Sequence, residues 1–402
     1  MIHLGDITKI SGYEVPIVDC VIGGSPCQDL SVAGKRAGLA GARSGLFMEQ
    51  IRLVKEMREQ DAERNRADGR ADRPVRPRYM VWENVPGASN CNGGKDFSAV
   101  LEEIVRIAEP EAPDLPVPPK GWSNAGAIVG DGWSIAWRTH DAKHWGVPQR
   151  RKRISLIADF GGKSAPEILF ECQSLPGNSE QSGKKRKRPS TGIERGVDKT
   201  SKCDRDMGIN TRTYDARGNG DGKTVCTITG DHQNRVTDYT AICLENNSAQ
   251  FWDGSQTAST LTANNANGSQ RMPDKENFNG VVQKQTVRRL TPLECERLQG
   301  FPDNWTNIGK WIDSKGKKHD SSDSARYKAL GNSIALPFWR FLCKRISAQY
   351  ARKATMASLF DGIGGFPLVW EEWNGKGSAV WASEIEEFPI AVTKYHFKEN
   401  NL

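Results

Sequence analysis

The segment Val18–Ser31, with the sequence VDCVIGGSPCQDLS, constrains the fold more than any other part of this 402-residue chain. Its apolar beginning predicts a strand that is buried in a parallel sheet. Gly23 and Gly24 allow a sharp turn and a close approach of the backbone to a ligand. Asp29 or Ser31 could cap a helix that follows the turn. Such a strand and turn are typical of open α/β sheets, which bind ligands at the carboxyl ends of their strands.

Cys27 follows Pro26 in this turn, and two interpretations of its thiol are open. A free cysteine is most often a small buried side chain that serves packing. A cysteine at the carboxyl end of a strand could instead be a nucleophile. Motifs elsewhere in the chain are needed to distinguish a buried thiol from a nucleophile.

The composition excludes several classes of protein. A chain of 402 residues can bury a large core and is long enough for two domains. It has no apolar run that could span a membrane and no signal-peptide pattern at its start, so we expect a cytoplasmic protein. The nine cysteines form no CxxC pair, which argues against a disulfide scaffold and against a metal site. The net charge of +7 favours a polyanionic partner.

Apolar periodicity predicts alternating helices and strands on both sides of a loop-rich middle region. Residues 58–78 are charged and without apolar periodicity, so we expect a surface loop there. Thr291, Pro292 and Glu294 predict a capping box at the start of a helix. The expected helices are 46–57, 96–108, one from Pro292, one apolar-faced helix over 328–346, one from about 367, and 388–397. The expected strands are 1–6, 18–22, 79–82, 133–139, 154–158, one leading into Ser358, and 378–384.

A change in composition predicts a second, smaller domain over 165–285, rich in loops and short strands. Short strand-like segments occur at 224–229, 239–244 and 258–261. The five cations of 184–188 (KKRKR) are either a solvated linker or a clamp on the DNA backbone. We expect four parts: 1–164 as the first part of a catalytic domain, 165–285 as the second domain, 286–355 as a joining region, and 356–402 as a cofactor-binding part.

The segment Ser358–Phe366 predicts a strand that leads through a glycine turn into a helix. Its FDGIGG sequence lacks the full GxGxxG pattern of dinucleotide-binding proteins. The next expected strand ends at Glu384, where a carboxylate could accept hydrogen bonds from both ribose hydroxyls of a nucleoside. The alternative is a glycine turn that serves packing, followed by a surface glutamate. The strand, turn and acid together favour nucleoside binding.

Taken together, these motifs resemble those of the DNA (cytosine-5)-methyltransferases everywhere except in 165–285. Pro26 and Cys27 match the nucleophile motif of that family, and Glu83, Asn84 and Val85 match its second catalytic motif. The resemblance implies catalytic roles for Cys27, Glu83, Arg153, Pro26, Asn84 and Arg151, of which the two arginines belong with Gln149 to a QxRxR motif. It implies an S-adenosylmethionine (SAM) site made by Phe360, Asp361, Gly362, Ile363, Gly364, Gly365, Glu384, Ile385, Asp6, Ile7, Asn332 and Ser333, the last two within GNSIALP.

The order of these motifs departs from the family. The FxGxG loop normally comes first, whereas here it follows all the others, from residue 356 onward. Joining the end of the chain to its beginning restores the ordinary spacing. The resemblance therefore implies a circular permutant with a Rossmann-like SAM-dependent methyltransferase sheet, cut at an exposed loop between a helix and a strand.

The resemblance also implies a reaction and its partners. Cys27 would add to C6 of a cytosine flipped out of double-stranded DNA, Glu83 would hold or protonate N3, and Arg153 would hold O2. Loop 34–45 would close over the base, and 165–285 would read the major groove. We expect a monomeric bacterial or phage enzyme of the restriction–modification type. The alternatives are a catalytically inactive DNA-binding relative, a thiol hydrolase and a nicotinamide oxidoreductase; the last two lack a supportive histidine motif and a complete glycine fingerprint, respectively.

Overall fold

A computed structural model describes residues 1–26, 45–70, 73–170, 210–215, 240–245, 281–283, 286–288 and 290–397. Between residues 210 and 288 it describes the backbone alone. The chain divides into two compact units. Unit 1 comprises 1–140, 152–180 and 339–402, and unit 2 comprises 141–151 and 181–338.

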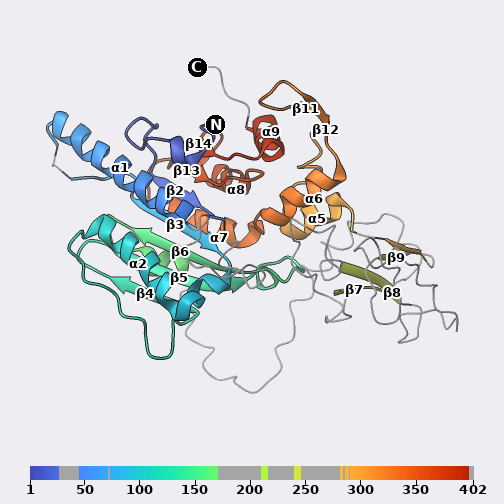
Figure 1. Cartoon of the computed structure of the whole chain (residues 1–402), viewed down its shortest axis with the longest axis horizontal. Coiled ribbons are helices and arrows are strands. Elements are labelled where there is room, and N and C mark those ends of the chain that lie inside the picture. The colour runs from blue at the N-terminus through green and yellow to red at the C-terminus, as the bar shows by residue number, and fades with distance from the viewer. Residues whose placement is uncertain are drawn as a thin grey trace. The chain divides into compact units, whose positions relative to one another are not determined.

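Unit 1 is built on an eight-stranded sheet with the order β1-β14-β13-β2-β3-β6-β5-β4, of which only the last residue of β5 belongs to unit 2. The first five strands in this order are parallel, whereas β6 runs antiparallel to β3 and β4 antiparallel to β5. The strands are β1 (Ile2–His3), β2 (Cys20–Gly23), β3 (Tyr79–Asn84), β4 (Ala125–Val129), β5 (Ser134–Asp141), β6 (Lys152–Asp159), β13 (Met356–Leu359) and β14 (Ala379–Ser383). Two strands from the end of the chain thus lie inside the sheet (Figure 1).

The register of the parallel strands aligns their carboxyl ends at one edge of the sheet. Leu359 pairs with both Gly23 and Ser383, and Gly23 pairs in turn with Trp82. If β13, β14, β1, β2 and β3 are counted as strands one to five, their spatial order is 3-2-1-4-5. This is the order of a doubly wound sheet, whose ligand crevice lies where the winding reverses, here between β13 and β2.

Helices cover both faces of the sheet, and the alternation of side chains along β2 and β3 shows which helix lies on which face. Val21 and Met80 belong to one apolar cluster with α1 (Gly45–Ala67) and α2 (Lys95–Ala108). Tyr79 points to the other face, where its ring lies 5.9 Å from that of Tyr350. On that side, Trp339 of α7 (Leu336–Ser347) packs edge-on against Phe366 of α8 (Gly365–Asn374). The last helix is α9 (Glu387–His396).

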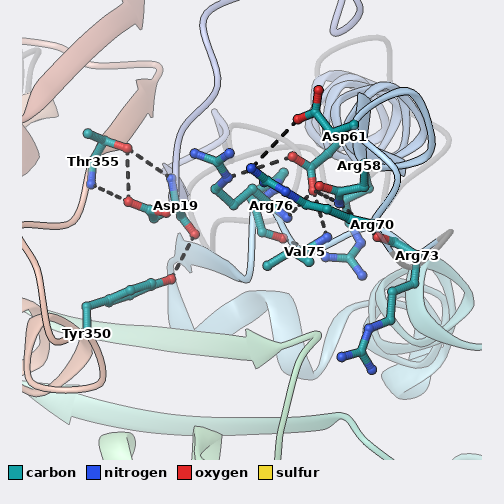
Figure 2. Close-up of polar contacts among 12 residues, drawn as sticks. Asp19, Arg58, Asp61, Arg70, Arg73, Val75, Arg76, Tyr350 and Thr355 are labelled. Carbon is teal, nitrogen blue, oxygen red and sulfur yellow. Dashed lines mark hydrogen bonds and ion pairs between the residues drawn. The ribbon is translucent and has the colours of Figure 1, made fainter. Parts of the chain in front are cut away.

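Asp19, directly before β2, fastens the C-terminal segment to the sheet (Figure 2). Its buried carboxylate accepts hydrogen bonds from both terminal nitrogens of Arg352, at 2.6 and 2.7 Å, and from the Thr355 N–H at 2.8 Å. Its backbone carbonyl accepts a hydrogen bond from the Tyr350 hydroxyl. Burial alone would raise the pKa of Asp19, but these hydrogen bonds outweigh it and hold that pKa below its usual value.

The expectation of a surface loop over 58–78 is wrong for residues 58–67, because α1 continues to Ala67. The second half of this helix buries polar side chains. The apolar periodicity therefore ends before the helix itself ends. Arg58 donates to the Pro77 carbonyl at 2.7 Å, and Asp61 accepts from the N–H groups of Val75 and Arg76 at 2.7 and 2.9 Å (Figure 2). The helix thereby holds the segment that leads into β3.

The single helix expected over 328–346 is also wrong, because the structure has two. Helix α6 (Asp323–Asn332) ends at Ser333, which is extended, and α7 begins at Leu336. Pro337 explains the break, because it has no N–H to donate to the Ser333 carbonyl four residues earlier. That carbonyl accepts a hydrogen bond from Arg151 instead.

Most other expected elements of the described residues are present. The helix over 96–108, the strands near 79–82, 133–139 and 154–158, and the elements after residue 356 are confirmed. The capping box of α5 (Pro292–Gln299) is confirmed, with Thr291 and Glu294 each bonded to the other's backbone N–H. The first strand is shorter than expected, since β1 ends at His3.

In unit 2 the described strands form a four-stranded sheet and a separate hairpin. The sheet has the order β10-β9-β8-β7, and the hairpin pairs β11 with β12. The strands are β7 (Asn210–Asp215), β8 (Thr240–Glu245), β9 (Val281–Gln283), β10 (Thr286–Arg288), β11 (Lys310–Ile312) and β12 (Lys318–Asp320). Strand β8 corresponds to the segment expected at 239–244, whereas 224–229, 258–261 and 184–188 lie outside the described residues. The division at 164, 285 and 355 stays a prediction.

Two absences concern the described residues alone. None of their helices is long and apolar enough to cross a membrane. In the same part of the chain, no three histidine, cysteine, aspartate or glutamate side chains gather as a metal site would require.

The Asp19 contacts predict a measurable loss of stability. We expect Asp19→Asn to lower the free energy of unfolding by about 2–3 kcal/mol, because charge-assisted hydrogen bonds to a buried carboxylate are lost. Denaturant unfolding at pH 7 measures this. Because the folded-state pKa of Asp19 is lowered, the difference from wild type should persist down to about pH 4 and shrink as the pH falls through that lowered value.

The matched control is Arg340→Gln, which breaks the half-exposed pair between Arg340 and Glu372. Such a pair is worth less than about 1 kcal/mol. Equal losses in the two variants would contradict the role given to Asp19.

Candidate active site

Five strand ends bring the candidate residues of unit 1 to one edge of the sheet. The turn after β2 carries Gly24, Ser25 and Pro26, and β3 ends with Glu83 and Asn84. The antiparallel strand β6 begins at this edge, as shown by the pairing of Asn84 with Ile154, the residue after Arg153. The glycine loop 360–365 follows β13, and Glu384 follows β14. Residues far apart in the sequence are therefore neighbours at the end of the sheet where a doubly wound fold binds its ligand.

Glu83 and Arg153 form an ion pair at this edge. The Arg153 Nε lies 2.8 Å from Glu83 Oε1, and only 17% and 11% of the two side chains are exposed. Arg153 also donates to the Lys152 carbonyl at 2.8 Å, which fixes its guanidinium. A glutamate and a guanidinium held together in this way can present to one polar ring a cation and either a carboxylate acceptor or, when the carboxyl is protonated, an O–H donor.

Gly24 allows the turn after β2 to approach this pair. A Cβ atom at Gly24 would lie only 3.0 Å from Glu83 Oε2, closer than nearly all real contacts of a Cβ atom. At Gly23 the Cβ would lie 2.5 Å from the amide oxygen of the buried Gln50. The two glycines thus leave room for the side chains of Gln50 and Glu83, whereas the predicted close approach to a ligand stays a prediction.

Ser25 is anchored by two buried side chains of β3. The Trp82 indole N–H donates to Ser25 Oγ at 3.0 Å, and the Asn84 amide donates to the Ser25 carbonyl and hydroxyl at 3.4 Å. The Asn84 oxygen accepts from the Val85 N–H at 2.8 Å. Pro26 is the last described residue of this turn, and Cys27 and 34–44 of the predicted closing loop lie outside the described residues. The anchor fixes the chain two residues before Cys27.

His140 lies behind Arg153 and was not singled out by the sequence. Burial, with Arg153 and Arg138 nearby, lowers the pKa of His140 to about 3. Its imidazole is therefore neutral at physiological pH and adds no charge beside the pair. Ser25 was missed as a site residue as well, since no signal in the sequence indicated it.

Glu384 holds the glycine loop against the end of β14. Its Oε2 accepts from the Gly362 N–H at 2.7 Å, and its Oε1 accepts from the N–H groups of Ile385 and Glu386 at 2.7 and 2.9 Å. Apart from its chain neighbours, no atom of the described residues lies within 4 Å of the place that a Cβ at Gly362 would take, so these residues leave space beside the loop. Phe360 adopts a positive φ of 55°, a rare conformation for a non-glycine residue and one that is concentrated at functional sites.

Asp361 is buried within the glycine loop. Its Oδ1 accepts a hydrogen bond from the Ser358 hydroxyl, while its Oδ2 has no partner in the described part of the chain. Burial, and to a smaller extent the nearby Glu384, raises the pKa of Asp361 to about 8. This carboxyl is therefore mostly protonated at neutral pH.

The remaining loop residues fall into two groups. Ile363, Gly364 and Gly365 are buried, and Gly364 has a φ of +79° with a Cβ position only 2.7 Å from the Phe397 ring. Ile385, in contrast, is 69% exposed beside Glu384, where it is free to contact a ligand.

Asp6 and Ile7 follow β1 at the same edge. Asp6 caps a short 3-10 helix (Ile7–Lys9) by accepting from the Thr8 N–H at 3.0 Å, and hydrogen bonds from Thr8 lower its pKa. The Ile7 side chain is only 3% exposed and belongs to the apolar core. Of the two, Asp6 presents a polar group.

Arg151, Asn332 and Ser333 belong to unit 2. Arg151 is buried, and its guanidinium donates to the carbonyls of Gly331 and Ser333. Its backbone N–H donates to Asp141 at 2.9 Å. Asn332 is the last residue of α6, and Ser333 caps that helix. Arg151 therefore holds the break between α6 and α7 within this unit.

Comparison with known families decides what kind of protein this is. The profile of the C-5 cytosine-specific DNA methylases matches residues 1–107 and 128–348, which is most of the chain. The chain belongs to the C-5 cytosine-specific DNA methylase family. The match ends before β13, so the glycine loop at the end of the chain lies outside it.

Several methyltransferases are similar to this family member over most of its length. It is 27% identical over 437 aligned positions to the DNA N-6-adenine-methyltransferase of Escherichia phage P1, covering 87% of this chain and 56% of that protein. It is 24% identical to the type II methyltransferase M1.ScrFI of Lactococcus lactis subsp. cremoris, covering 83% of this chain and 63% of the relative. The corresponding values for M2.BsuMI of Bacillus subtilis strain 168 are 25%, 97% and 72%.

The chain thus spans only about three fifths of the first two relatives. Among solved structures, the Dnmt2 methyltransferase of S. pombe aligns with a TM-score of 0.41 and 15% identity, covering 86% of this chain and 83% of that one. The Rossmann-like methyltransferase fold of this family member is seen in its own sheet order.

The raised pKa of Asp361 predicts how stability depends on pH. The folded protein holds a proton on this carboxyl that the unfolded chain releases above about pH 4. We therefore expect the stability of wild type, relative to Asp361→Asn, to fall as the pH rises from about 4 to about 8 and then to stay level. Urea unfolding at intervals from pH 5 to pH 9 measures the difference.

Asp68→Asn, at an exposed aspartate of unit 1, is the control and should differ from wild type by the same small amount at every pH. A level difference for Asp361→Asn over the same range would show that Asp361 is not a protonated buried group.

Proposed function

We propose that this protein transfers the methyl group of SAM to C5 of a cytosine in a specific sequence of double-stranded DNA. One observation carries the proposal. The Glu83–Arg153 pair touches the turn that leads into Cys27, at the same sheet edge as the glycine loop and Glu384. The pair, the thiol and the loop are what a cytosine C5 reaction needs, and family membership supports the same chemistry.

The residues around the glycine loop fit the cofactor. Methyltransferases of this family use SAM as the methyl donor. A nucleoside could approach the backbone at Gly362, where space is open. It could contact the ring of the half-buried Phe360 and donate hydrogen bonds to the Glu384 carboxylate. Ile385, Asp6 and the loop residues Asp361, Ile363, Gly364 and Gly365 would complete this side, and the assignment of Asn332 and Ser333 to the cofactor stays a prediction from the sequence. When bound, SAM supplies the methyl group.

Cytosine C5 is a weak nucleophile within an aromatic ring, and the protein's own residues would overcome this. The Cys27 thiolate forms a bond to C6, and the electron pairs shift through C5 and C4 to N3, which takes a proton from Glu83. C5 becomes an enamine carbon able to accept a methyl group. A base then removes the C5 proton, the bond from Cys27 to C6 breaks with the thiolate as leaving group, and N3 returns its proton to Glu83.

Arg153 and the Ser25 anchor would position these reacting groups. The Arg153 guanidinium would hold O2 of the base and favour the thiolate form of Cys27. The hydrogen bonds from Trp82 and Asn84 to Ser25 limit how the turn with Pro26 and Cys27 can move, and fixed geometry supplies much of the rate in such reactions. Arg151 is proposed to act through the backbone of unit 2 rather than on the base.

C5 is not accessible inside a duplex, so the base would be flipped out. Loop 34–45 is proposed to close over it, and 165–285 to read base edges in the major groove. We also infer that the chain is a circular permutant, since the strand order counted from β13 is that of an unpermuted doubly wound sheet.

A second candidate follows from the name of the phage P1 relative, a DNA N-6-adenine-methyltransferase. Transfer to an exocyclic amine needs no thiol adduct, so it gives Cys27 and Glu83 no role. A catalytically inactive DNA-binding relative would likewise leave both residues without a task. The identity of the methylated base separates the three.

Cys27 provides the direct test. We expect Cys27→Ser to lower the rate of methyl transfer to DNA by at least about 10³-fold, because the C6 adduct can no longer form. SAM affinity, measured by calorimetry, should stay within about twofold of wild type. The wild type should also form a denaturant-resistant adduct with DNA that carries 5-fluorocytosine. This base has fluorine in place of the C5 proton, so the step that releases Cys27 cannot occur.

Cys203→Ser, in the predicted second domain, is the matched control and should keep both activity and adduct formation. A fully active Cys27→Ser variant would overturn the nucleophile assignment. Methyl transfer without a 5-fluorocytosine adduct would favour the adenine reaction, and neither transfer nor adduct would favour the inactive relative.

A further inference from the structure

The hairpin of β11 and β12 is a feature that the proposed reaction does not use. Along the chain of unit 2 it connects α5 to α6 (Figure 1), in a segment for which the sequence predicted no element. Trp311 pairs with His319, and Lys310 and Ile312 pair with Asp320 and Lys318. The strands therefore turn Trp311 and His319 to one face and the other four residues to the opposite face.

Side-chain contacts stiffen this hairpin. Asp313 accepts from the N–H groups of Lys315 and Lys317 at 3.0 and 2.8 Å, and it pairs with His319 Nε2 at 2.8 Å. The rings of Trp311 and His319 stack with their centroids 4.5 Å apart. The backbone and hydroxyl of Ser321 both donate to the Gly309 carbonyl and close the base. The turn is fixed by backbone groups and one carboxylate, not by lysines.

The lysines of the hairpin are consequently left for an external partner. Lys310, Lys315, Lys317 and Lys318 are all exposed, and within the described residues none of their ammonium groups forms an ion pair. The Asp313 carboxylate is already engaged by His319 and the turn, and its pKa is lowered by those hydrogen bonds. Only Asp320, opposite Lys310, offers a second negative charge in the hairpin.

The side chains present also indicate which part of a nucleic acid they would contact. Residues 310–320 (KWIDSKGKKHD) contain no arginine, asparagine or glutamine, the residues that read guanine or adenine with two hydrogen bonds. Lysine ammonium groups on a stiff support suit phosphate oxygens, which position a duplex without reading its sequence.

We propose that the β11–β12 hairpin binds the phosphate backbone of the DNA substrate and contributes affinity without sequence specificity. The proposal rests on the proposed function, because it needs DNA as the substrate. An acidic protein partner would suit the same lysines, but the proposed DNA substrate supplies a polyanion that the protein must bind in any case.

The test compares two triple variants that remove the same charge. K315Q/K317Q/K318Q removes three lysine charges from the hairpin. K163Q/K353Q/K376Q removes three charges from exposed lysines at the opposite end of the unit 1 sheet, away from the proposed active site. Binding of a mixed-sequence duplex is measured by fluorescence anisotropy between 50 and 200 mM salt. Each lost phosphate contact lowers the salt slope of log K by about 0.9.

We expect the hairpin variant to lose about 2–3 units of salt slope and the control variant less than one. K315R/K317R/K318R should restore the slope, and the methyl-transfer rate at saturating DNA and low salt should stay within twofold of wild type. Equal slopes for wild type and the hairpin variant, with normal methyl transfer, would overturn the hairpin contact and leave the proposed function standing. A wild type that binds no DNA would overturn both.

Discussion

The parallel pairing of β13 with β2 is the interaction on which the rest of the structure depends. It joins the last part of the chain to the first and places Leu359 opposite Gly23, so the glycine loop and the turn toward Cys27 emerge at one edge. The buried carboxylate of Asp19 holds the other end of this pair through Arg352 and Thr355. Without that pairing, the glycine loop and the turn toward Cys27 would not be held next to each other.

At the edge where the parallel strands end, the structure brings together charged and polar side chains from several strands. Glu83 and Arg153 pair beside the close approach of Gly24, and Trp82 and Asn84 anchor Ser25 from the same strand. Other ionisable groups nearby are neutralised by burial: the lowered pKa of His140 and the raised pKa of Asp361 leave both mostly uncharged at neutral pH.

Most helices and strands of the described residues could be predicted from the sequence, because apolar periodicity and capping residues are local patterns. The prediction failed where contacts between distant residues determine the structure. The second half of α1 is helical because Arg58 and Asp61 bind the segment before β3, and no periodicity records such partners. Pro337 does indicate the break before α7, because proline lacks the N–H that a continuous helix would need there. The contact between Trp82 and Ser25 joins residues 57 positions apart, so no local pattern could reveal it.

The central claim is that these residues act together on cytosine C5, and the most direct measurement is the identity and position of the modified base. DNA from cells that express the protein can be analysed by bisulfite sequencing, together with mass spectrometry of its nucleosides. We expect 5-methylcytosine at one fixed sequence context in DNA from cells that express the wild type. DNA from cells that express the Glu83→Gln variant should contain none above background. N6-methyladenine as the only new base, or 5-methylcytosine that persists in the variant, would contradict it.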